Sequence, residues 1–125
     1  MDTINKKILI VEDNKDYSFI LQSNFKKEGF AIVIAQNGEE GLNLIEKEKP
    51  DLILLDLQMP VMDGWEMAQK MKEKNINIPV IFLTEHKDPN YISRAIEIIP
   101  TDYILKAEIL PDNIISEVKK KLGIN

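Results

Sequence analysis

The chain has 125 residues, of which 44% are hydrophobic and 30% are charged, so it is long enough to bury the core of one domain. It has no cysteine, which excludes disulfides, thiolate metal sites and cysteine nucleophiles. A net charge of −5 argues against direct nucleic-acid binding, and no signal peptide or membrane-spanning apolar stretch is visible. We therefore expect one cytoplasmic domain over residues 1–125, without membrane insertion.

The first half of the chain alternates short apolar runs with segments of helical periodicity. In chain order we predict a strand at 8–11, a helix through 17–25, a strand at 30–35, a helix through 42–45 and a strand at 52–55. Most of these runs are continuously apolar rather than alternating, which is typical of parallel strands covered on both faces. Gly29 and Pro50 are suitable stops for the two helices.

The second half continues this alternation. In chain order we predict a helix through 65–71 opened by Asp63-Gly64, a strand at 80–83, a helix through 91–99, a strand at 103–105 and a helix over 111–122. Pro100 stops the fourth helix, and Pro111 suits the first turn of the last one. The chain is therefore predicted to be an α/β protein, with a doubly wound, five-stranded parallel sheet flanked by five helices on both faces.

Polar residues follow four of the predicted strands. These residues are Glu12, Asp13, Asp56, Thr84 and Lys106. Taken singly, each also fits an ordinary role as a turn former, a helix cap or a solvated lysine. Ligands bind at the carboxyl ends of the strands in open parallel sheets, and these five residues would meet at that edge. Their coincidence at successive strand ends indicates a functional site.

The charges at this edge favour a bound cation. Three carboxylates and one ammonium leave a net charge of about −2 in a small cleft, and crowded like charges are unfavourable. With no cysteine and a single histidine, the oxygen ligands suit a hard ion such as Mg²⁺ better than zinc. Mg²⁺ bound there would keep a coordination position for a phosphoryl donor.

The ordered set of residues resembles the receiver domain of two-component response regulators, and above all the stand-alone, single-domain type. The matching residues are Glu12-Asp13, Asp56, Met59-Pro60, Asp63-Gly64, Thr84, Tyr103 and Lys106. The resemblance covers essentially the whole chain. It implies a flavodoxin-like fold with strand order 2-1-3-4-5.

The resemblance also implies roles for these residues. Asp56 would accept a phosphoryl group from the phosphohistidine of a histidine kinase or phosphotransfer protein. Mg²⁺, or Mn²⁺ as a substitute, would be held by Asp13, Asp56 and the backbone carbonyl of Gln58, with Glu12 acting through water. Lys106 would pair with a phosphoryl oxygen. The protein would then be a phosphoacceptor switch that catalyses its own phosphorylation and dephosphorylation, rather than an enzyme acting on other substrates.

The switch itself would involve two further side chains. The hydroxyl of Thr84 would bond the phosphoryl group, and Tyr103 would turn inward behind it. The output surface would be formed by the fourth helix, the last strand and the last helix, and it would bind an unidentified downstream protein. The same surface could also join two copies of the chain in a homodimer.

The chain departs from the family pattern at several positions. Ala107 stands where a proline joined through a cis peptide is usual, so the bond after Lys106 is either cis at a cost of roughly 2.5–4 kcal/mol or trans in a rearranged loop. We expect Lys106 to reach the site in either case, because its stem is long and flexible. Glu85 replaces a small residue and is expected to point to solvent. Gln58 and His86 are expected to set the lifetime of the phosphorylated state.

Three functions are alternatives to a phosphoacceptor switch. A docking module that keeps the fold without phosphorylation is favoured by Ala107 and Glu85 but disfavoured by the full acid set. A haloacid-dehalogenase-like phosphatase needs a second aspartate where this chain has Gln58. A flavin carrier needs a phosphate-binding loop after the first strand, where Glu12-Asp13 would repel phosphate.

Overall fold

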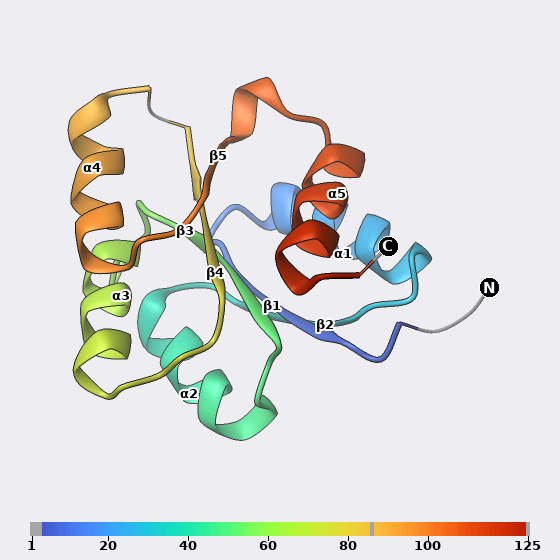
Figure 1. The fold of residues 1–125 in the computed structure, drawn as a ribbon, viewed down its shortest axis with the longest axis horizontal. Coiled ribbons are helices and arrows are strands. Elements are labelled where there is room, and N and C mark those ends of the chain that lie inside the picture. The colour runs from blue at the N-terminus through green and yellow to red at the C-terminus, as the bar shows by residue number, and fades with distance from the viewer. Residues whose placement is uncertain (1–3, 86, 125) are drawn as a thin grey trace.

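The computed structural model describes residues 4–85 and 87–124, in which strands alternate with helices (Figure 1). In chain order the elements are β1 (Lys7–Val11), α1 (Lys15–Lys27), β2 (Ala31–Ala35), α2 (Gly38–Glu48), β3 (Leu52–Asp56), α3 (Gly64–Glu73), β4 (Val80–Thr84), α4 (Pro89–Ile98), β5 (Tyr103–Leu105), a 3₁₀ turn (Lys106–Glu108) and α5 (Pro111–Leu122). Every predicted strand and helix is present. For α2 the predicted range of 42–45 covers only the apolar centre of the helix.

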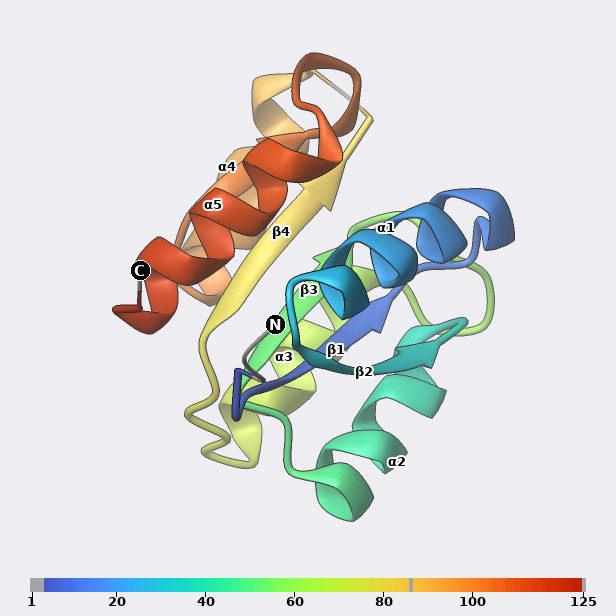
Figure 2. The ribbon, with the colours of Figure 1, turned by 90° about the vertical axis from the view of Figure 1, so that its right-hand side faces the viewer.

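The five strands form one parallel sheet in the order β2-β1-β3-β4-β5, which confirms the predicted fold class and strand order. In Figure 2 the arrows of β1, β3 and β4 point the same way. Register places Val11 beside Leu55, and Asp56 beside Leu83. The carboxyl ends of β1, β3 and β4 therefore lie together at one edge of the sheet.

Two hydrophobic cores lie on opposite faces of the sheet. One lies beneath α2, α3 and α4, and the other beneath α1 and α5 (Figure 1). Along β1, Leu9 and Val11 face the first core, whereas Ile8 and Ile10 face the second. All residues of β3 and β4 are buried. Burial on both faces explains why these strands read as continuous apolar runs.

An aromatic contact joins α3 to α4. The indole Nε1 of Trp65 donates to the carbonyl of Tyr91 at 3.1 Å, and the two rings stack with centroids 5.3 Å apart. The guanidinium of Arg94 lies 4.7 Å from the centre of the indole. Because Trp65 opens α3 and is 5% exposed, α4 is held at its first two turns against the start of α3.

The loops after β4 and β5 contain Glu85 and Ala107, two residues that depart from the family pattern. The peptide bond between Lys106 and Ala107 is trans, and Lys106 begins the 3₁₀ turn. In the loop before β5, the hydroxyl of Thr101 donates to the carbonyl of Val80 at 2.5 Å. Glu85 is exposed, as expected. Among the described residues, no helix has both the length and the apolar character needed to cross a membrane.

Candidate functional site

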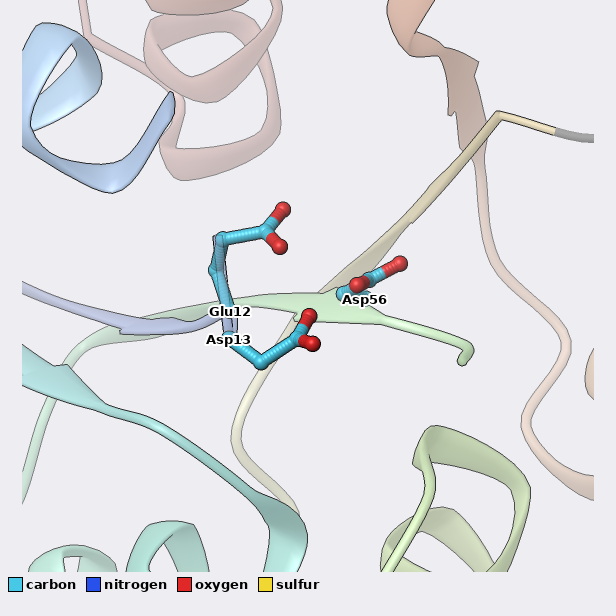
Figure 3. Close-up of side chains that lie close together, drawn as sticks. All are labelled: Glu12, Asp13 and Asp56. Carbon is cyan, nitrogen blue, oxygen red and sulfur yellow. The ribbon is translucent and has the colours of Figure 1, made fainter. Parts of the chain in front are cut away.

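Three carboxylates converge at the carboxyl edge of the sheet (Figure 3). Glu12 and Asp13 follow β1, and Asp56 ends β3; an oxygen of each lies within 4.8 Å of the others. Asp13 is exposed, whereas Glu12 and Asp56 are only 1% and 5% exposed. Such burial of acids is rare unless they are paired or bind a cation. They line a cleft of about 210 Å³.

The turn after β1 holds the carboxylate of Glu12. The backbone N–H of Asn14 donates to Oε2 of Glu12 at 3.1 Å. The side chain of Asn14 caps α1, with its Oδ1 accepting from the N–H of Tyr17 at 3.0 Å. The strand, the acidic turn and the first turn of α1 are thus connected through one asparagine.

The segment after β3 fixes Asp56. The side chain of Asp63 caps α3 by accepting from the N–H of Glu66 at 2.9 Å, and the N–H of Gly64 donates to the carbonyl of Leu57 at 2.9 Å. A Cβ at Gly64 would lie 2.3 Å from the carbonyl oxygen of Asp56. Glycine is required there because the start of α3 packs directly against the backbone of Asp56.

Lys106 enters the cleft from the end of β5. Its ammonium forms an ion pair with Oε1 of Glu12 and lies 3.5 Å from Oδ2 of Asp56. The side chain is 8% exposed, and the ammonium also lies 4.8 Å from the centre of the Tyr17 ring. The trans bond to Ala107 therefore does not keep the ammonium out of the cleft.

The remaining predicted residues are placed differently. Gln58 is exposed and Thr84 is 1% exposed, and both line the acidic cleft. Tyr103 is 45% exposed and lines a separate groove over β5, between α4 and α5, so the structure does not bring it into the acidic cleft. His86 lies outside the described residues.

Two residues beside the cleft were not predicted as site residues. Tyr17 was predicted only as the start of a helical pattern over 17–25, and Asn14, the N-cap of α1, was given no role in the site. A signal was nevertheless present in the sequence, since helical side chains lean toward the N-terminus of their helix. A ring in the first turn of α1 therefore extends toward the cleft, where it lies near Glu12 and Lys106.

The electrostatics of the cleft show an excess of negative charge. Burial, followed by the charge of Glu12, raises the pKa of Asp56 from 3.8 to about 8, although Lys106 acts in the opposite direction. Burial and the charges of Glu12 and Asp56 raise the pKa of Tyr17 to about 12. One ammonium therefore does not offset the carboxylates, and this set of oxygen donors fits a small, hard divalent cation.

Comparisons with known proteins agree with this geometry. A family model described as "Response regulator receiver domain" matches residues 8–119. The chain is 38% identical over 121 residues to sporulation initiation phosphotransferase F of Bacillus subtilis (strain 168), covering 97% of each chain. It is 35% identical over 103 residues to the alkaline phosphatase synthesis transcriptional regulatory protein PhoP of the same organism, covering 82% of this chain but only 43% of that relative.

A solved structure shows the same fold. The receiver domain of the Francisella response regulator 1452 superposes with a TM-score of 0.87 at 28% identity. The match covers 95% of this chain and 98% of that chain. The likeness therefore extends over nearly the whole of both chains.

Proposed function

This chain belongs to the response regulator receiver domain family, and on that premise we propose that Asp56 accepts a phosphoryl group from a histidine kinase or phosphotransfer protein. One observation carries the proposal. The Asp56 carboxylate ends a buried strand inside an acidic cleft, with the Lys106 ammonium 3.5 Å from its Oδ2. A carboxylate beside a cation and further oxygen ligands is the arrangement that phosphoryl transfer needs.

The transfer is a simple displacement. An oxygen of Asp56 attacks the phosphorus of the donor phosphohistidine, the new O–P bond forms as the N–P bond breaks, and the histidine nitrogen leaves with the electron pair. Lys106, now paired with Glu12, would turn toward a phosphoryl oxygen. The hydroxyl of Thr84 would donate to another oxygen of the same group. Positioning and charge neutralisation supply most of the catalysis in such transfers.

The residues that would hold Mg²⁺ are Asp13, Asp56 and the backbone carbonyl of Gln58, with Glu12 acting through water. When bound, Mg²⁺ would supply positive charge that keeps Asp56 ionised and offsets the charge of the phosphoryl group. The raised pKa of Asp56 supports this assignment, because burial and the neighbouring carboxylates favour protonation of the acceptor at neutral pH. Mn²⁺ is the expected substitute ion.

The signal would leave through the surface formed by α4, β5 and α5. Tyr103 is exposed on that surface before phosphorylation, and it would turn inward once Thr84 bonds the phosphoryl group. The change would be read by a downstream protein or by a second copy of the chain. Gln58 and His86 would set the rate at which water removes the phosphoryl group. Because histidine kinases draw on ATP, the proposal places the chain in the cytoplasm.

The test is the intact mass of the protein after incubation with acetyl phosphate, with and without Mg²⁺. The wild type should gain one phosphoryl group only with Mg²⁺, and Asp56→Asn should gain none. Asp16→Asn removes an exposed acid from the first turn of α1 and should behave like the wild type.

No uptake from acetyl phosphate, and none from a phosphorylated phosphotransfer protein, would overturn the proposal. That result would favour the alternative of a docking module that keeps the receiver fold without being phosphorylated. Uptake that persists in Asp56→Asn would show that another residue is the acceptor.

A further inference from the structure

We propose that Tyr17 is a positioning residue for phosphoryl transfer, which holds the ammonium of Lys106 in the acidic cleft through the face of its aromatic ring. The inference rests on the function proposed above for Asp56 and Lys106. It assigns a role to a side chain on α1 whose hydroxyl forms no hydrogen bond with Asp56 or with the residues proposed to hold Mg²⁺. Tyr17 would act on the ammonium of Lys106, which is the group proposed to pair with an oxygen of the transferred phosphoryl group.

The contact has the geometry of a cation–π interaction. The Nζ of Lys106 lies 4.8 Å from the centre of the Tyr17 ring, inside the range of about 6 Å over which such attraction acts. The lysine side chain is 8% exposed, and its ammonium also contacts the carboxylate of Glu12. The ammonium is therefore held between an aromatic face and carboxylates in a largely desolvated place, where this attraction is strongest.

The position of Lys106 in the chain explains why it needs such support. It follows a strand of three residues and begins a 3₁₀ turn. The residue after it is alanine, so no proline ring restricts the backbone at this point. The lysine stem itself has four flexible bonds. Little in the local backbone therefore fixes the direction in which the ammonium points.

Tyr17 is anchored more firmly. It lies in the first turn of the 13-residue helix α1, and its N–H is bonded to the capping side chain of Asn14. Further along the same helix, Leu21 and Phe25 are fully buried in the core. A rigid element thus presents the ring to Lys106, and this can replace the restriction that the β5–α5 loop does not provide.

The environment of the Tyr17 hydroxyl indicates that the aromatic ring, and not the hydroxyl, is the functional part of this side chain. Its oxygen is buried and has no hydrogen-bond partner among the described residues, which is an unfavourable environment for a phenol. The phenol also stays neutral at physiological pH, since its pKa is raised to about 12. We therefore expect phenylalanine to serve as well as tyrosine, and an aliphatic residue of similar size to fail.

Two measurements on Tyr17→Phe and Tyr17→Leu test the inference, with Phe19→Leu as the control. Phe19 lies on the same helix but is 65% exposed, so its replacement removes a ring outside the cleft. The first measurement is the NMR shift of the Lys106 ε-methylene protons in the metal-free protein. An upfield shift caused by the ring should be present in the wild type, Tyr17→Phe and Phe19→Leu, and lost in Tyr17→Leu.

The second measurement is the rate of phosphorylation by acetyl phosphate with saturating Mg²⁺. Loss of the ring should slow the maximal rate about five- to thirty-fold, with little change in the acetyl phosphate concentration that gives half of it. Tyr17→Phe and Phe19→Leu should keep the wild-type rate. In a Lys106→Ala background, Tyr17→Leu should cause no further loss, because the group that the ring positions is gone.

Several outcomes would overturn the inference. A Lys106 methylene shift that is the same in Tyr17→Leu as in the wild type would show that the ring does not hold the lysine. An equal loss of rate in the Lys106→Ala background, or a loss in Tyr17→Phe, would show a different role for Tyr17. If the wild type takes up no phosphoryl group, the function proposed for Asp56 fails, and the methylene shift still decides whether Tyr17 holds Lys106.

Discussion

Replacing Asp56 with asparagine should stabilise the metal-free protein. The carboxyl is 5% exposed, beside Glu12 and near Asp13, and its pKa is raised from 3.8 to about 8. A folded-state pKa above the unfolded one means that the native state binds the proton more tightly. The contribution of this carboxyl to the free energy of unfolding is therefore fully present below about pH 4 and is lost as the pH rises toward 8. Asparagine has nearly the same shape and carries no charge, so its native state escapes this loss.

The magnitude follows from the rise in pKa. At about 1.36 kcal/mol for each pKa unit, the raised pKa of Asp56 costs at most roughly 4 to 5 kcal/mol of folding free energy at pH 7 to 8. Water entry and side-chain relaxation reduce such costs in partly buried sites. We therefore expect Asp56→Asn to gain about 2 to 4 kcal/mol near pH 8. The gain should shrink toward zero near pH 4.

The assay is urea unfolding with EDTA at several pH values, for the wild type, Asp56→Asn and Glu97→Gln. Glu97 is an exposed acid on α4, so its replacement controls for the loss of one negative charge far from the cleft. The decisive quantity is the difference in unfolding free energy between Asp56→Asn and the wild type. If that difference is independent of pH, or if the control matches it, the argument that the cleft charges destabilise the fold is wrong.

Further predictions concern the cation, the glycine beside Asp56, the lysine and the loop before β5. Mg²⁺ should raise the melting temperature of the wild type more than that of Asp56→Asn, and its binding near pH 7 should release protons, seen as a binding heat that changes with buffer. In urea unfolding, Gly64→Ala should lower the free energy of unfolding by about 2 kcal/mol or more, because its Cβ would lie 2.3 Å from the Asp56 carbonyl oxygen. The control Gly123→Ala should lower it by only about 1 kcal/mol, because nothing but the φ of 71° opposes a side chain there. Lys106→Ala should leave phosphorylation by acetyl phosphate measurable but slow, and wild-type kinetics would remove Lys106 from the proposed mechanism. Thr101→Val should lose about 1 kcal/mol in the same unfolding assay by breaking the hydrogen bond to the Val80 carbonyl, and an unchanged midpoint would show that bond to be unimportant.

The fold was predictable because its signals are local. A strand buried on both faces must be apolar throughout, and residues 52–55 and 80–83 show that composition directly. The meeting of Glu12, Asp13 and Asp56 was predictable for a related reason, since parallel strands bring their carboxyl ends to one edge. Both inferences need only the spacing of apolar residues along the sequence and the parallel direction of the strands.

Other features depend on distances that a linear pattern does not contain. Gly64 reads as part of a helix start, but its necessity comes from the close approach of α3 to the backbone of Asp56. The ring of Tyr17 reads as core, and only the path of β5 brings Lys106 over it. The outward position of Tyr103 likewise depends on how α4 and α5 flank β5.

The contact between Trp65 and α4 has a practical consequence. Trp65 is the only tryptophan of the chain, it directly follows the glycine that touches the backbone of Asp56, and it carries Tyr91 and Arg94 of α4 on its indole. An intrinsic fluorophore therefore sits between the acidic cleft and a helix of the output surface. Stopped-flow emission of the unlabelled protein could time any motion that links the two, without a dye on the surface that partners would bind.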